Sequence, residues 1–242
     1  MDRYFTTTDG VTLHYTVKGN GNIPVVILPG MGMPAESFDS VTDRLGKEYT
    51  FYALDYRCHG RSEDVAYGYH TERFAADMKA MLDDANIDRF HLIAHSMGNA
   101  VAWAFMELYG QQRIISYVLE EEAPCLLSDP SWSEEDKGSY RGTMDWPSFM
   151  DMDSSSVRSE FMCNLFHDHV NNDWRQEVKR IKLPTLILMG ETSHYACPDL
   201  WKWLNETIEG SRLVTFNGGH NLHADCEDGV VSEISAFLTA QA

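Results

Sequence analysis

Short apolar runs alternate with helical patterns along this chain, and this alternation limits the fold more than any other feature. The runs are rich in β-branched and aromatic residues. They cover residues 12–17, 25–28, 49–54, 90–94, 117–119, 185–189 and 213–216, and helical stripes cover residues 74–82, 100–108 and 230–238. Such alternation favours a mostly parallel sheet with helices on both faces, so we predict an α/β fold with about eight strands. The period of two in the first run predicts an antiparallel strand.

The alternation stops in one segment. Residues 125–179 contain no clear strand, many Ser and Asp residues, and scattered aromatic side chains. We predict a helical cap (lid) inserted into a core of residues 1–124 and 180–242, because long insertions between strands are usually functional. A long excursion that packs elsewhere is the alternative.

Composition excludes several classes of partner. The chain has 242 residues, is 43% hydrophobic and carries a formal net charge of −18. A field of that sign repels nucleic acid and anionic lipid, so we expect neither as a partner. The five cysteines are odd in number and never in C-x-x-C spacing. No apolar run approaches the roughly 18 residues that span a bilayer, and no apolar leader is evident. We therefore expect a cytoplasmic protein with reduced thiols, no membrane span and no metal site.

The sharpest local signal is Ala94-His95-Ser96-Met97-Gly98, which lies between a predicted buried strand and a predicted apolar helix. This context is the one that a nucleophile elbow requires, since a very tight turn needs small residues two positions either side of the serine. We therefore predict Ser96 as a nucleophile. A serine that merely caps the helix is the alternative.

At this point the sequence resembles the α/β-hydrolase fold superfamily, over nearly the whole chain. Its serine hydrolases include esterases and cofactor-free haloperoxidases. Residues 28–32 (LPGMG) look like that family's oxyanion loop, which implies that the backbone N–H groups of Met31 and Met97 bind the oxyanion. Residues 55–62 (DYRCHGRS) look like its D-x-R-G-x-G-x-S segment, with Cys58 in a glycine position, and imply a structural role.

The candidate base is His220, which follows the last predicted strand in Gly218-Gly219-His220. The family places its catalytic histidine there, and the chain order puts this loop near Ser96. His223 is the second candidate. We expect His95 to point away from the nucleophile, because side chains alternate along a strand. The pair His167 and His169 lacks an evident third ligand, so lid or solvated histidines are favoured over a metal site.

The acid departs from the family pattern. Most relatives carry Asp in a G-x-x-D stretch after the seventh strand, and Ser193 holds that position here. A serine cannot supply a negative charge beside an imidazolium. Residues 118–124 (VLEEEAP) resemble a strand end that carries the acid in some members, and Glu121 falls on that position. We predict Glu121 as the acid, ahead of Glu122 and Glu120, with a solvated acidic turn as the alternative.

These residues together predict two-step acyl transfer without a metal or organic cofactor. Ser96 would attack a carbonyl, His220 would move the proton, and water would release the acyl-enzyme. The expected substrate is a small carboxylic ester, with thioester, lactone and amide open, because apolar side chains are candidates to line the pocket. Besides the oxyanion-loop methionines, the candidate substrate-binding residues are Met33, Trp132, Trp146 and Phe149.

Two other functions stay open at this stage. The same fold hosts C–C bond hydrolysis and perhydrolysis, which the predicted triad does not separate from ester hydrolysis. A non-catalytic ligand-binding homologue is favoured only by Ser193. A homodimer is also left open by the sequence.

Overall fold

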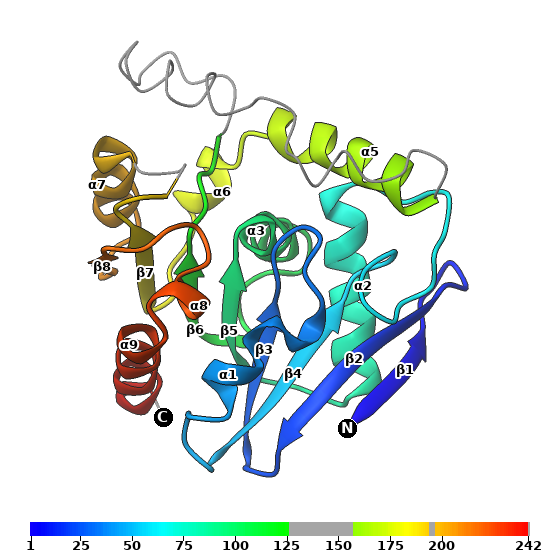
Figure 1. Cartoon of the computed structure of the whole chain (residues 1–242), viewed down its shortest axis with the longest axis horizontal. Helices are drawn as coiled ribbons and strands as arrows, with labels where there is room; N and C mark the ends of the chain where they lie inside the picture. Colours follow the sequence, from blue (N-terminus) through cyan, green and yellow to red (C-terminus); the bar gives the residue numbers. More distant parts are fainter. Residues whose placement is uncertain (126–156, 194–196, 242) are drawn as a thin grey trace.

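The computed structural model describes residues 1–125, 157–193 and 197–241 (Figure 1). An eight-stranded sheet forms its centre, in the order β1-β2-β4-β3-β5-β6-β7-β8. The pairs β1–β2 and β2–β4 are antiparallel, and all other neighbours in this sheet are parallel. The strands are β1 (Asp2–Thr6), β2 (Thr12–Gly19), β3 (Ile23–Leu28), β4 (Tyr49–Asp55), β5 (Phe90–His95), β6 (Ile114–Glu120), β7 (Thr185–Gly190) and β8 (Arg212–Phe216).

Helices cover both faces of the sheet (Figure 1). Helices α2, α3 and α7 contribute to one apolar core, and α1, α8 and α9 contribute to the other. The described helices are η1 (Ala35–Phe38), α1 (Asp39–Thr42), α2 (Thr71–Asp84), α3 (Met97–Tyr109), α5 (Val157–Asn171), α6 (Arg175–Val178), α7 (Pro198–Thr207), α8 (Leu222–Asp225) and α9 (Glu227–Ala240).

The central strands form because their side chains are buried on both faces. Every residue of β5 and β7 is buried. In β3, Val26 and Leu28 belong to one core, whereas Val25 and Ile27 belong to the other. This period of two explains why continuous apolar runs, rather than alternating ones, mark these strands in the sequence.

The predicted α/β fold is confirmed, and each predicted strand and helix lies within an observed element. The described elements without a predicted counterpart are the edge strand β1, helix α7 and the short helices η1, α1 and α8. Strand β1 lies at the sheet edge with four of its five residues exposed, so it lacks an apolar pattern. Helix α7 buries Leu200, Trp201 and Leu204 at helical spacing, so the sequence does carry an apolar stripe for this helix.

The predicted cap is described only in part. The chain leaves the core after β6 and comes back to the same place, since Cys125 and Asp173 form a β-bridge. The Trp174 N–H also donates to the carbonyl of Pro124 at 2.6 Å. Helix α5 lies across the N-terminal end of α2, where Asp168 accepts hydrogen bonds from the Thr71 N–H and hydroxyl (Figure 1). Within the described residues, no helix is both long and apolar enough to cross a membrane.

Residues 55–62 hold the loops above β4 together, as their predicted structural role requires. The buried Asp55 carboxylate accepts the N–H of Ala35 at 2.6 Å and of Arg61 at 2.9 Å, and it lies 2.7 Å from His14 Nδ1. Cys58 has a φ of 60°. This left-handed conformation favours glycine, which explains why the family motif has glycine at this position.

A second buried ion pair joins the same segment to α2. The guanidinium of Arg57, with a fully buried side chain, donates to both carboxylate oxygens of Asp77 at 2.8 Å. Asp77 is also fully buried. Removal of Arg57 would take away one of the two guanidinium groups that compensate this buried carboxylate; the other is that of Arg73, which donates to Asp77 Oδ1 at 2.8 Å.

We therefore expect Arg57→Met to lower the free energy of unfolding by about 3 kcal/mol, the low end of the range for a broken buried ion pair, because Arg73 still pairs with Asp77. Urea unfolding followed by circular dichroism measures this loss. Arg61→Met is the matched control, because Arg61 is half-exposed and pairs with Asp2 and Glu36 at the surface, where ion pairs contribute little. Equal losses in the two variants would contradict a structural role specific to the buried pair.

Candidate active site

Ser96 lies in a strained turn between β5 and α3. Its backbone has φ 50° and ψ −132°, a conformation that residues other than glycine rarely adopt. A Cβ atom on Gly98 would lie 2.2 Å from the carbonyl oxygen of Leu28, so only glycine fits there. This geometry is the tight strand-to-helix turn that the sequence predicts around a nucleophile.

Hydrogen bonds from β6 hold this turn in place. The Ser96 N–H donates to the carbonyl of Glu120 at 3.0 Å. The Asn99 side-chain amide donates to the carbonyls of Ser96 at 3.1 Å and Glu120 at 2.9 Å, and it accepts from the Tyr117 hydroxyl at 2.6 Å. Sequence reasoning missed Asn99, although a single amide within a buried apolar helix was a usable signal.

The predicted acid and base lie together. Glu121 follows β6, is fully buried, and has a φ of 54°. One of its oxygens, Oε2, lies 3.2 Å from Nδ1 of His220, which is partly exposed. The same oxygen accepts a hydrogen bond from the Ser193 hydroxyl, and Oε1 accepts one from the Gly190 N–H.

The two neighbouring glutamates face different histidines. Oε1 of Glu120 accepts the N–H of His223 at 2.9 Å and lies 2.8 Å from its Nδ1. Oε2 of Glu122 lies 3.2 Å from Nε2 of His169 on α5. All three glutamates are fully buried, so the alternative of a solvated acidic turn is wrong. His169 is buried as well, which excludes the solvated state that was one of its two predicted environments.

The ring of His95 contacts the backbone of the candidate base, His220. Its Nε2 lies 2.9 Å from the carbonyl oxygen of His220, and the two rings are 4.8 Å apart. Burial lowers the pKa of His95 to about 3, so the ring is neutral. The carbonyl can only accept, and therefore Nε2 carries the proton and donates it.

The predicted oxyanion loop lies against the elbow. A Cβ on Gly30 would come within 2.8 Å of His95 Nδ1, which shows how closely the loop and the end of β5 approach. Met97 is the first residue of α3, where N–H groups have no acceptor within the helix. Met31 and Met33 are half-buried in this loop. Trp132, Trp146 and Phe149 lie outside the described residues.

His59 has a structural role in the same loop. Its Nε2 accepts the N–H of Gly32 at 2.9 Å, and its Nδ1 lies 3.1 Å from the carbonyl of Arg57. The ring must therefore be the tautomer with a proton on Nδ1. His59 thus fixes the loop that carries Met31 without reaching the predicted triad in any of these contacts.

One cluster has donor atoms of the kind that metals bind. In the described part of the chain, His95, Glu120 and His223 offer ligand atoms within 4.8 Å of one another. Zinc sites commonly take such residues, but Nδ1 of His223 and Nε2 of His95 are already hydrogen-bonded. The buried atoms without a hydrogen-bond partner here are Glu120 Oε2 and His95 Nδ1, one fewer than the three protein ligands of a catalytic zinc site.

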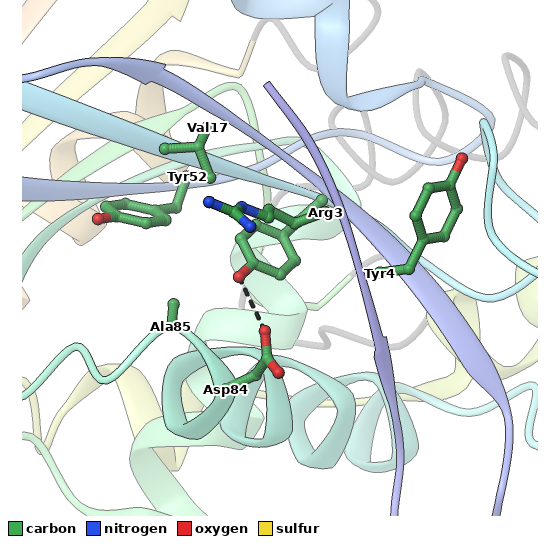
Figure 2. Close-up of a pocket in the computed structure, with 7 residues that line it drawn as sticks. Arg3, Tyr4, Val17, Tyr52, Asp84 and Ala85 are labelled. Atoms are coloured by element: carbon green, nitrogen blue, oxygen red, sulfur yellow. Dashed lines mark hydrogen bonds between the residues drawn. The ribbon is translucent and has the colours of Figure 1, made fainter.

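A surface hollow of about 410 Å³ lies elsewhere, beside β1, β2 and β4 and the end of α2 (Figure 2). The Tyr15 hydroxyl donates to Asp84 at 2.8 Å across it. None of the predicted site residues lines this hollow, so it does not contribute to the candidate active site.

The Glu120–His223 pair gives the stability a defined pH dependence. Burial opposes both charges, but Glu120 raises the pKa of His223 above 6.5 and His223 lowers the pKa of Glu120 below 4.5. Asp225 adds to the effect on His223. The contribution of His223 is complete below 6.5 and is lost as pH rises through its raised pKa, whereas that of Glu120 is lost as pH falls below 4.5.

We expect the pair to stabilise the fold most between pH 4.5 and 6.5. His223→Asn should cost about 3 kcal/mol at a pH in this range and less at alkaline pH. Urea unfolding across the pH range measures the difference, with His167→Asn on exposed α5 surface as the control. A constant difference between His223→Asn and the natural protein at all pH values would contradict the ion pair.

Comparison with known proteins agrees with this geometry. A family model described as the alpha/beta hydrolase fold matches residues 23–173. The AB hydrolase superfamily protein YisY of Bacillus subtilis is 26% identical over 267 residues, which cover 98% of this chain and 99% of that protein. An esterase structure from Exiguobacterium antarcticum has a TM-score of 0.80 at 21% identity and covers 99% of this chain and 100% of that one. A bromoperoxidase structure from Bacillus anthracis has a TM-score of 0.81 at 19% identity with the same coverage. The predicted family is therefore confirmed, and the chain belongs to the α/β hydrolase fold family.

Proposed function

We propose that this protein is a serine hydrolase that cleaves small carboxylic esters with Ser96 as nucleophile, His220 as base and Glu121 as acid. The contact between the buried Glu121 carboxylate and Nδ1 of His220 is the main support. An imidazole whose Nδ1–H is held by a carboxylate keeps Nε2 available as a base. The esterase from Exiguobacterium antarcticum, which shares the fold, agrees with this activity.

The proposed reaction has two steps. Ser96 attacks the ester carbonyl while Nε2 of His220 takes the hydroxyl proton, and the proton then passes to the leaving alcohol. The N–H groups of Met31 and Met97 stabilise the oxyanion. Water then attacks the acyl-enzyme with His220 again as base, which releases the acid and restores the serine. Glu121 stays ionised throughout and stabilises the imidazolium.

The substrate pocket in this proposal lies between the oxyanion loop and the proposed cap, residues 125–179. Met31 and Met33 are half-buried next to the elbow and offer soft apolar surface for an acyl group. We propose the predicted cap residues Trp132, Trp146 and Phe149 as further lining. These side chains favour an apolar acyl or aryl ester over a charged one.

A non-catalytic homologue loses its one supporting feature. Ser193 occupies the usual acid position, but its hydroxyl donates to Glu121. The residue at the usual acid position is therefore compatible with an acid that comes from the end of β6, because it binds that acid. Nothing in this contact distinguishes ester hydrolysis from perhydrolysis or C–C bond hydrolysis, so products must be assayed with water and with peroxide as acceptor.

A fluorophosphonate probe tests the nucleophile directly. We expect the natural protein to be labelled and Ser96→Ala to lose both labelling and hydrolysis of nitrophenyl esters, because the probe reacts only with an activated serine. Intact-mass measurement detects one adduct. Ser116→Ala, on β6, is the matched control and should be labelled normally. Labelling of Ser96→Ala at the natural rate would contradict the assignment.

The acid is tested by amide substitutions. Glu121→Gln should lower kcat by about 10³-fold or more, since the amide cannot compensate the imidazolium charge. Two control variants remove other carboxylates: Glu122→Gln removes a buried one, and Glu191→Gln removes an exposed one. We expect the kcat of both variants to stay within about tenfold of the natural kcat. Nitrophenyl esters of graded chain length give the rates, and thermal melting checks folding. A folded Glu121→Gln variant with near-natural kcat would remove Glu121 from the triad.

A further inference from the structure

We propose, on the basis of the function proposed above, that Ser193 is a positioning residue that orients the Glu121 carboxylate toward His220. Its hydroxyl donates to Oε2, the same oxygen that faces Nδ1 of His220. The residue at the customary acid position thus acts on the acid instead of supplying it.

The loop that carries Ser193 is well placed for this role. Ser193 is 7% exposed, and its N–H closes a turn onto the carbonyl of Gly190 at 3.2 Å. Within that turn, Thr192 donates its N–H to the carbonyl of Gly218, two residues before His220, at 3.1 Å. One short loop is therefore bonded both to the acid and to the segment that carries the base.

Close packing keeps this loop and the His220 segment in a fixed relation. A Cβ on Gly190 would lie 2.5 Å from the carbonyl oxygen of Gly219 and 2.6 Å from that of Gly218, so no side chain fits between them. The Gly190 N–H donates to the other oxygen of Glu121. The two donors from this loop therefore hold the two carboxylate oxygens separately, which fixes the plane of the carboxylate.

The charge of Glu121 explains why a donor is needed at this point. A fully buried carboxylate requires hydrogen bonds to offset its desolvation, and His220 supplies only one. The Ser193 hydroxyl also withdraws some negative charge from Oε2. Without it, more charge would act on the imidazolium, and His220 would hold its proton to a higher pH.

Two effects of Ser193→Ala follow. We expect kcat to fall by about ten- to hundredfold with KM unchanged, because a hydrogen bond to a charged group is lost while the substrate pocket is untouched. We also expect the acidic limb of the kcat/KM profile to move to higher pH. Ser193→Thr keeps the hydroxyl and should recover most of both properties.

Thr192→Val is the matched control. It removes the hydroxyl of an exposed residue in the same turn and leaves the backbone bond to Gly218 intact. We expect this variant to keep the natural kcat and the natural pH profile. Thermal melting of all variants separates a loss of folded protein from a loss of catalysis.

Moving the carboxylate from position 121 to position 193 by mutation gives a second, independent test. In Glu121→Gln/Ser193→Asp, a carboxylate replaces the hydroxyl that touches the Glu121 oxygen, and we expect at least a tenfold gain in kcat over Glu121→Gln alone. In Ser193→Asp alone, two adjacent carboxylates would compete for one site, and we expect a lower kcat than in the natural protein.

The outcomes separate this inference from the proposed function. If Glu121→Gln abolishes activity but Ser193→Ala keeps the natural kcat and pH profile, Ser193 is not a positioning residue and the triad stands. If Ser193→Ala lowers kcat without moving the acidic limb, and Ser193→Thr does not recover it, the residue has only a structural role. If Glu121→Gln is fully active, the proposed triad itself fails.

Discussion

Three consecutive buried carboxylates at the end of β6 set the arrangement of everything around the candidate site. A buried carboxylate is costly unless a partner compensates it. Here Glu120 and Glu121 each have an imidazole within hydrogen-bond distance, His223 and His220, whereas Glu122 accepts the Ala123 N–H and lies 3.2 Å from His169. These contacts tie one strand end to α8, to the loop after β8 and to α5. The same feature that would destabilise an isolated strand therefore organises three separate segments around it.

Ser96 and Glu121 share an unusual backbone conformation. Ser96 follows β5 and Glu121 follows β6, and each has a positive φ near 50°. This repeated left-handed step redirects the side chain at the ends of two adjacent parallel strands. The cost is about 1–2 kcal/mol for each residue, and it persists because the surrounding hydrogen bonds hold the backbone. Asn99 donates to the Ser96 carbonyl, and the Leu188 carbonyl of β7 accepts the Glu121 N–H at 3.0 Å.

Much of this architecture is predictable from the sequence. The apolar runs that become β3, β5, β6 and β7 can be recognised in the sequence because both faces of each strand are buried. The exposed edge strand β1 has no such pattern, so it was missed. Ser96, His220 and Glu121 are proposed from local motifs and from their resemblance to the family pattern. Their partners were harder to foresee, because which histidine faces which glutamate depends on long-range packing. The partner of Glu122, for example, lies in the predicted cap, and that of Glu120 lies on α8.

The proposed triad requires that Glu121, and neither of its neighbours, holds Nδ1 of His220. Proton NMR of protein with ¹⁵N-labelled histidine tests it most directly at a pH where His220 is charged, since a ring N–H bonded to a carboxylate resonates at low field. We expect a low-field Nδ1 proton that disappears both in Glu121→Gln and in His220→Gln. It should persist in Glu122→Gln. A resonance that His220→Gln abolishes, that survives Glu121→Gln and that is lost with another carboxylate would contradict this assignment.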